Sequence, residues 1–488
     1  MTILTFYGGV NEVGGNKILL EEQGTKVFLD FGVSFSGANL YFDEFLQPRK
    51  CNGMFDLIEL GLLPDLKGIY RCDYLEHCQR QKEEKGIDAV LLSHAHMDHC
   101  SYIHYLRQDI PIYCTQASRD IMQSIDDTGS TGKTELVWFK DSFKTYRNTR
   151  GGISRLTGEK TEKLRSYQII DRSKFKINDL EIEALPVSHS LEGANAYIIH
   201  SEKGPIIYTG DLRFHGYKGG LTKEFVKYAS SLEPIAMICE GTRIDDLTSR
   251  SELEVKEEIR REVEPTKGLV IANFPVRDTD RMKTFLEVAK ETGRSLVINL
   301  KQAYLLELFE SGIEAPKVDD ENIRIYAPRK SWGLIGNENF PKKLQYEDYD
   351  CWEREFLDHK NLVTAKEIRS DQSSYIFRCD FFELKELIDI LPQEGSRYIR
   401  SVCEPFDLEM EINQEKVNNW LRHFNLYPYI QTHASGHLNQ EDLKGIIQEI
   451  SPKKMYPVHT ANPEKFADLV KGLETEICKT EKGRPYEI

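Results

Sequence analysis

Residues His94–His99 (His-Ala-His-Met-Asp-His) constrain the fold of this chain more than any other stretch. They follow Asp88–Ser93, an apolar run that predicts a buried strand ending at the metal-binding side chains. A strand end is rigid, so the loop that leaves it can direct several side chains toward one point. Imidazoles and a carboxylate suit zinc or a similar divalent ion. Three of the 13 histidines fall here, which predicts a metal centre: the first two histidines can bind one ion, and the last two residues can face a second.

Five further apolar runs also end in a residue that can bind metal or transfer protons. These residues are His189, Asp211, Glu240, His437 and His459. One such strand end carries little information, but six in one chain predict a shared edge of a sheet. That edge would suit a two-metal site, since each ion needs about four ligands with one position left for water or substrate.

The composition places the chain among globular proteins. Its 488 residues allow two or three domains, with 40% hydrophobic and 29% charged residues. No apolar run approaches about 18 residues, so we expect no membrane span. The start, Met1–Tyr7, enters a strand without a preceding basic segment, which predicts no signal peptide and a cytoplasmic protein. The ten cysteines form no Cys-x-x-Cys pair, and we expect reduced thiols.

The organisation of the chain changes near residue 246, where strands and helices begin to alternate. This alternation predicts a mostly parallel α/β sheet. Ser251–Glu254 is a capping box at the start of a helix, and residues 361–368 read as a strand. We therefore predict three segments: a first domain, an inserted domain, and the closing part of the first domain, over residues 1–245, 246–425 and 426–488.

Two segments of the first domain stand apart from this plan. Residues 36–86 are a long insertion, with a helix expected over Asp73–Lys85, and we expect it over or beside the active site. Residues Lys133–Arg165 hold nine Lys/Arg and four Asp/Glu, a balance of 9 − 4 = +5 in a chain of net charge −15. Aromatic residues are interleaved with these cations. The segment fits a solvated loop, and equally a surface that follows phosphates and stacks on bases.

These motifs resemble the metallo-β-lactamase superfamily. The matching stretches are Gly8–Gly15, His94–His99, Ser188–Ser190, Thr209–Asp211 and Pro457–His459. Cys239–Arg243, Ser435–His437 and Phe274–Arg281 are similar to motifs of its β-CASP nucleases. The resemblance covers almost the whole chain and includes ribonuclease J and the archaeal nucleases related to cleavage and polyadenylation factors. It implies an α/β fold: an αββα-sandwich metallo-β-lactamase domain with an inserted, mostly parallel β-CASP domain.

The resemblance also implies roles for individual residues. His94, His96 and His189 would bind one ion, Asp98, His99 and His459 the other, and Asp211 would bridge the two. The implied cofactor is a pair of Zn²⁺ ions, with Mn²⁺ as the alternative. The implied catalytic residues are Asp98, Glu240 and His437. Substrate would contact the backbone around Ser435 and Gly436 and the side chain of Arg281, although Arg277 and Arg281 also fit structural ion pairs.

The implied activity is that of a zinc-dependent ribonuclease in RNA processing or decay. Metal coordination would lower the pKa of a bound water toward about 7 and give hydroxide for in-line attack. His437 would protonate the departing ribose oxygen, and Glu240 would orient it and raise its pKa. Single-stranded RNA is the expected partner, and no membrane is expected. Three questions stay open: whether DNA is also a substrate, whether the cleavage is endo- or exonucleolytic, and which oligomeric state the protein adopts, a homodimer included.

Two other functions stay open beside this one. One is a metallo-β-lactamase-fold hydrolase of DNA or a small ester, and the other is a non-catalytic subunit that binds RNA or protein. The inserted domain argues against a small-molecule enzyme, which needs no second domain to hold its substrate. The complete ligand set and the Glu240–His437 pair argue against a non-catalytic subunit, since inactive relatives typically lose ligands.

Overall fold

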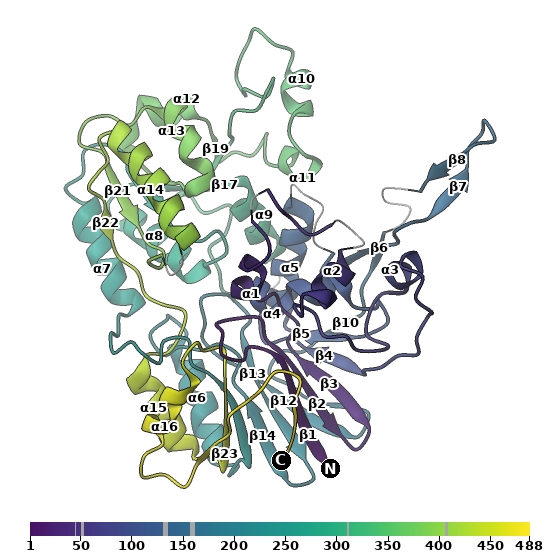
Figure 1. The fold of residues 1–488 in the computed structure, drawn as a ribbon. Helices are drawn as coiled ribbons and strands as arrows, with labels where there is room; N and C mark the ends of the chain where they lie inside the picture. Colours follow the sequence, from purple (N-terminus) through teal and green to yellow (C-terminus); the bar gives the residue numbers. More distant parts are fainter. Residues whose placement is uncertain (44, 50–52, 130–134, 157–161, 310–311, 406–407) are drawn as a thin grey trace. The chain divides into compact units, whose positions relative to one another are not determined.

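The computed structural model describes residues 1–43, 45–49, 53–129, 135–156, 162–309, 312–405 and 408–488 (Figure 1). The chain forms two compact units. The first unit comprises Met1–Phe214, Lys218–Thr248 and Gly436–Ile488, and the second comprises His215–Tyr217 and Ser249–Ser435. The predicted second boundary, after residue 425, precedes β22 (Ile430–Gln431), which pairs with β21 (Arg397–Arg400) in the sheet of the second unit.

The first unit contains two seven-stranded sheets. Sheet one has the order β10 (Tyr167–Ile169), β5 (Ile112–Cys114), β4 (Ala89–Leu91), β3 (Thr25–Leu29), β2 (Lys17–Glu22), β1 (Thr2–Gly8) and β25 (Pro485–Glu487). Sheet two has the order β11 (Lys174–Ile177), β12 (Leu180–Pro186), β13 (Asn195–Ser201), β14 (Gly204–Tyr208), β15 (Ala236–Glu240), β23 (Lys454–Val458) and β24 (Glu476–Ile477).

The two sheets pack face to face over one apolar core. Phe6 and Leu91 of sheet one and Ile182, Ile238 and Val458 of sheet two are buried in the same cluster. The burial of alternate residues along β12 follows the period of two of a strand. The interior of the first unit is therefore a β-sandwich, as the sequence motifs predict.

Helices cover the outer faces of the sandwich. On sheet two, the apolar sides of α6 (Gly219–Ser230), α15 (Gln440–Ile450) and α16 (Phe466–Leu469) form a second core. On sheet one, α5 (Gln116–Thr128) contacts β10, where the hydroxyl of Tyr167 donates to the sulfur of Met122 at 3.6 Å. The first unit is thus an αββα sandwich, and the α/β fold class expected from the sequence is confirmed.

The second unit is built on one parallel sheet. Its order is β19 (Leu362–Val363), β18 (Ile323–Tyr326), β17 (Ser295–Asn299), β20 (Tyr375–Arg378), β16 (Val270–Asn273), β21 and β22. On one face pack α7 (Glu252–Val263), α8 (Thr279–Glu291) and α9 (Leu300–Leu308). On the other pack α12 (Ala365–Ser370), α13 (Leu387–Ile390) and α14 (Leu408–His423). Helices on both faces are what a parallel sheet requires, because its crossovers lie there.

Local sequence signals explain several element ends. Ser251 and Glu254 form the predicted capping box of α7. The predicted strand over residues 361–368 is wrong beyond Val363, because Thr364 and Glu367 form a second capping box that starts α12. The predicted helix over Asp73–Lys85 is also shorter, since α3 (Cys72–His77) ends before Gln79, whose φ is +60°. Among the described residues, no helix has both the length and the apolar sequence needed to cross a membrane.

Candidate metal centre

The strand directions of the first unit gather the candidate ligands at one sheet edge. In sheet two, β14, β15 and β23 are parallel neighbours, and β12 runs the same way because β13 between β12 and β14 is antiparallel to both. Their carboxyl ends therefore lie together. The residues at or just beyond these ends are His189, Asp211, Glu240 and His459. The loop after β4 of sheet one adds His94–His99, which enters the short helix α4 (Met97–Cys100).

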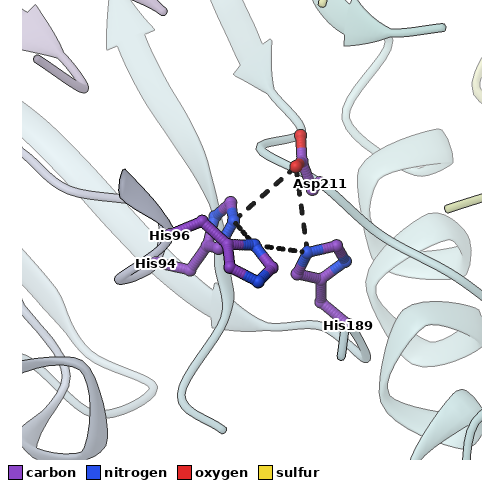
Figure 2. Close-up of side chains that lie close together, drawn as sticks. All are labelled: His94, His96, His189 and Asp211. Carbon is purple, nitrogen blue, oxygen red and sulfur yellow. Dashed lines mark hydrogen bonds and ion pairs between the residues drawn. The ribbon is translucent and has the colours of Figure 1, made fainter. Parts of the chain in front are cut away.

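One cluster consists of His94, His96, His189 and Asp211 (Figure 2). The Nδ1 atom of His96 lies 2.9 Å from Nε2 of His94 and 3.0 Å from Nε2 of His189. Burial lowers the pKa of all three histidines, that of His96 to about 4. The imidazoles are therefore neutral near pH 7, which is the form that binds metal.

A second cluster consists of Asp98, His99 and His459. Oδ2 of Asp98 lies 3.1 Å from Nε2 of His459, and Nε2 of His99 lies 3.2 Å from Oδ2 of Asp211. Burial alone would raise the pKa of Asp98, but the neighbouring imidazoles of His99 and His459 hold it well below its usual range. Asp98 is therefore anionic at neutral pH, which suits a candidate oxygen ligand.

Asp211 connects the two clusters. Its Oδ2 atom lies 3.2 to 3.8 Å from ring nitrogens of five histidines, namely His94, His99, His189, His437 and His459. Burial opposes ionisation, yet the surrounding imidazoles hold the pKa of Asp211 well below its usual range. Its position between the clusters is the one that a bridging carboxylate requires.

Buried atoms without partners show that these residues fit divalent metal ions. Oδ1 of Asp211 is buried and has no hydrogen-bond partner among the described residues, and the buried Nε2 of His99 has only the 3.2 Å ion-pair contact with Oδ2 of Asp211. Such atoms are costly to bury unless something satisfies them. Neighbouring carboxylates, Asp211 first, raise the pKa of His99 against the effect of burial, so a cation would bind this imidazole in exchange for its proton.

In two of the candidate ligands, His94 and His99, the Nδ1 atom meets an acceptor that orients the ring. Nδ1 of His94 donates to the Ser93 hydroxyl at 3.0 Å, and Nδ1 of His99 donates to Asp30 at 2.7 Å. Asp30 also accepts from the Ser93 hydroxyl and, at 2.5 Å, from that of Tyr208. With the protons on Nδ1, the Nε2 lone pairs of both histidines are left for an ion.

The same arrangement holds for His189 and depends on a glycine. Nδ1 of His189 donates to the carbonyl oxygen of Gly436 at 2.6 Å. A Cβ atom at position 436 would lie only 2.9 Å from Cε1 of His189. Gly436 thus positions a candidate ligand, which is a different role from the predicted substrate contact.

Glu240 and His437 form a pair beside the second cluster. Nδ1 of His437 lies 2.9 Å from Oε2 of Glu240, while Oε1 of Glu240 accepts from the backbone of Leu212 at 3.1 Å. These two residues also lie with Asp211 and His459 in one group that could hold an ion. Burial would lower the pKa of His437, but Glu240 and Asp211 raise it to about 9.

Thr242 is a residue that the sequence motifs did not single out. Its hydroxyl donates to Oε2 of Glu240 at 2.7 Å and accepts from Nδ1 of His459 at 2.8 Å. The hydroxyl also lies 3.2 Å from Nδ1 of His437. Thr242 therefore connects the Glu240–His437 pair with the candidate ligand His459. The only sequence signal was its place two residues after Glu240.

The predicted substrate contact of Arg281 requires a correction. Its guanidinium is fully buried, pairs with Glu252 at 3.0 Å, and donates to the carbonyls of Ser401 and Ala434. This is the structural ion pair that the sequence left as the alternative. Ser435, the other predicted contact, is the last residue of the second unit, and its carbonyl accepts from His215 at 2.7 Å.

Comparisons with known proteins agree with this fold. The model of the "Beta-lactamase superfamily domain" matches residues 73–225. The protein named ribonuclease J of Pyrococcus abyssi is 23% identical over 305 residues, which cover 59% of this chain and 57% of that protein. The ribonuclease J of Mycolicibacterium smegmatis is 25% identical over 334 residues, which cover 66% of this chain and 48% of that protein.

A crystal structure of a protein of unknown function from Enterococcus faecalis V583 shares the fold, with a TM-score of 0.72, 24% identity, and 99% of each chain covered. The chain spans about half the length of the curated relatives named above. The resemblance that the motifs indicated is confirmed. Residues 73–225 match the beta-lactamase superfamily domain, and the chain is similar to the proteins named ribonuclease J.

Proposed function

We propose that this protein is a metal-dependent phosphodiester hydrolase that cleaves single-stranded RNA in RNA processing or decay. The observation that carries the proposal is the Glu240–His437 pair, which lies within ligand distance of Asp211 and His459. A proton donor next to a metal site is what cleavage of a phosphodiester needs. The similarity to proteins named ribonuclease J supports RNA as the substrate.

The candidate ligands would hold two divalent ions, Zn²⁺ or Mn²⁺. His94, His96 and His189 would bind one ion, Asp98, His99 and His459 the other, and Asp211 both. When bound, these ions would supply a hydroxide nucleophile at neutral pH and draw charge from the phosphate oxygens. The fixed Nδ1 protons keep the ligating lone pairs aimed at the ions without reorganisation.

His437 would act as the general acid. Glu240 accepts a hydrogen bond from Nδ1–H of His437, which leaves Nε2–H of the imidazolium to protonate the departing ribose oxygen. In the metal-free protein, Glu240 and Asp211 raise the pKa of His437 to about 9 against the effect of burial, so the ring is protonated at neutral pH. After transfer, Glu240 holds the neutral ring in the tautomer that can be protonated again at Nε2.

Purified protein with end-labelled single-stranded RNA and single-stranded DNA tests the proposal. We expect RNA cleavage with Zn²⁺ or Mn²⁺, loss of cleavage in chelator, and no cleavage by Asp211→Ala. Labels at the 5′ and 3′ ends separate the two modes, since an exonuclease releases mononucleotides from one end and an endonuclease gives internal fragments. Metal-loaded wild type that leaves RNA intact would contradict the proposal. Cleavage of DNA or a small ester alone would select the alternative hydrolase.

A further inference from the structure

A two-stranded ribbon in the first unit is not explained by the metal centre. It is the β7–β8 arm, residues 141–156, in which β7 (Thr145–Arg147) pairs with β8 (Ile153–Arg155). Figure 1 shows the arm extending beyond β6 (Trp138–Lys140), which pairs with β9 (Glu162–Leu164). All three residues of β7 are exposed, so the arm contributes little to the core.

The base of the arm is fixed to helix α3, which belongs to the insertion over residues 36–86. Oδ2 of Asp73 accepts from the backbone of Ser142 at 2.9 Å, and the ring of His77 stacks on Phe143 with 3.8 Å between centroids. The buried Arg71 donates to the carbonyl of Lys140 at 2.7 Å. The insertion thus has a structural role, since it holds the start of the arm in place.

The turn of the arm is ordered as well. The side-chain oxygen of Asn148 accepts from the backbone of Arg150 and of Gly152, both at 3.0 Å, and its amide donates to the hydroxyl of Ser154 at 2.8 Å. These bonds define the turn from its own residues. An arm fixed at its base and at its turn presents its side chains in a defined arrangement.

The arm reverses the charge of the chain. Residues 141–156 contain four Lys/Arg and one Asp, a balance of 4 − 1 = +3, whereas the whole chain carries −15. Lys144 pairs with Asp141 at 2.7 Å. Arg147, Arg150 and Arg155 are exposed, and no ion pair joins them to another described residue. Three exposed guanidinium groups on an acidic protein are complementary to a polyanion.

The strand register sorts the side chains onto two faces. Arg147 lies opposite Ile153 and Arg155 opposite Thr145, so both arginines share one face. Tyr146 lies opposite Ser154 on the other face. Tyr146 is 49% exposed, so its ring is accessible for stacking. Guanidinium forks bind phosphate oxygens, and exposed aromatic rings stack on unpaired bases.

We propose that the β7–β8 arm binds single-stranded RNA away from the metal centre, with Arg147, Arg150 and Arg155 on phosphates and Tyr146 on a base. The site rests on the proposed function only in taking RNA as its ligand. Its chemistry is that of single-strand binding surfaces, which combine cations along the backbone with aromatic stacking.

Binding of fluorescently labelled single-stranded polyuridylate, followed by anisotropy in EDTA over a range of salt, tests the arm. Each phosphate contact contributes about 0.7 to the slope of log Kd against log salt. We therefore expect the triple variant R147Q/R150Q/R155Q to lower the slope by about 2 and to weaken binding about 100-fold at 0.1 M salt. Tyr146→Ala should weaken binding about tenfold, whereas Tyr146→Phe should bind like wild type.

Lys163→Gln is the matched control, because Lys163 is exposed and already paired with Asp141 at 2.9 Å. It should change the slope much less than any one of the three arginines. The proposal would be overturned if the triple variant unfolds at the wild-type temperature and keeps the wild-type slope of log Kd against log salt. The exposed arginines would then fit an acidic protein partner instead. An equal loss on single-stranded DNA also supports phosphate contacts.

The binding assay contains no metal and needs no cleavage. If the arm binds RNA but the protein does not cleave it, the proposal for the arm stands and the proposed nuclease function is contradicted. If the protein cleaves RNA and the triple variant binds RNA as tightly as wild type, the nuclease function stands and the proposal for the arm is contradicted.

Discussion

Nδ1 of His437 lies 2.9 Å from Oε2 of Glu240, and the same nitrogen lies 3.8 Å from Asp211. His437 is thus close enough to the candidate metal centre to contact a phosphate bound there. Its Nδ1 atom is already hydrogen-bonded to Glu240. The geometry allows two roles for His437. It could be the acid of the reaction, or it could be a further ligand in the group with Asp211, Glu240 and His459.

His437→Ala separates these two roles. If His437 is the acid, the variant should keep its bound metal and lose about 10²–10⁴-fold in kcat. Glu240→Gln should retain metal and lose less, since the amide can still accept the Nδ1 proton but no longer stabilises the imidazolium. Metal content by elemental analysis, measured beside RNA cleavage, is the readout. A fall in bound zinc in His437→Ala would show that His437 is a ligand instead.

Thr242→Val is expected to weaken metal binding at the second cluster. The substitution keeps the shape of the side chain but removes the hydroxyl that accepts from Nδ1 of His459 at 2.8 Å. A residue that orients a ligand in this way typically contributes about 10–100-fold in metal affinity. Competition with a fluorescent chelator measures that affinity. Thr242→Ser retains the hydroxyl and is the matched control, so equal affinities of the two variants would contradict this role.

The candidate ligands could be found from the sequence because each stands at the end of a short apolar run. That pattern is local, and the parallel order of β14, β15 and β23 then brings the ends together. Thr242 could not be found in the same way. Its contacts reach His437 and His459, which are 195 and 217 residues away along the chain. Nothing near Thr242 in the sequence signals them.

Arg281 shows the opposite failure, in which a local motif suggests too much. The resemblance implied a substrate contact for Arg281, with a structural ion pair as the alternative, and Glu252, 29 residues earlier, forms that ion pair in the second unit. Strand assignment failed for a related reason at residues 361–368, where the capping box of Thr364 and Glu367 prevails over the strand-forming residues before it. Propensity gave the wrong element there because the cap satisfies the first backbone N–H groups of a helix.

Gly436→Ala should impair the metal centre without disturbing the fold. The added Cβ would meet Cε1 of His189 at 2.9 Å and Oγ of Ser190 at 3.1 Å, so the ring must move away from the first cluster. A displacement of about 1 Å at such a site can cost about 10²-fold in rate. Cleavage kinetics at saturating metal measure the loss. Gly445→Ala, in α15 with no atom within 4 Å of the new Cβ, is the control. It should retain activity and gain about 0.5–1 kcal/mol in stability. Equal activity of the two variants would contradict the positioning role of Gly436.

Asp120 in α5 makes a pH-dependent contribution to stability that does not involve the metal centre. Its side chain is 4% exposed, accepts from Gln116 at 2.6 Å, and lies 3.7 Å from Nη1 of Arg119. Burial raises the pKa of Asp120 from 3.8 to about 6. Between these values the folded state holds a proton that the unfolded state has lost. Stability therefore falls as pH rises from about 4 to about 6, and the loss is complete above that range.

The variant Asp120→Asn removes this titration and retains an oxygen that can accept from Gln116. Relative to wild type, its free energy of unfolding should rise by up to about 3 kcal/mol between pH 4 and pH 7, since one pKa unit corresponds to about 1.4 kcal/mol. Urea unfolding of the metal-free protein at a series of pH values measures the difference and keeps metal release out of the transition. If the difference in free energy of unfolding between variant and wild type stays constant across this range, the pKa of Asp120 is not raised in the folded state. Another group would then offset the effect of burial on this carboxylate.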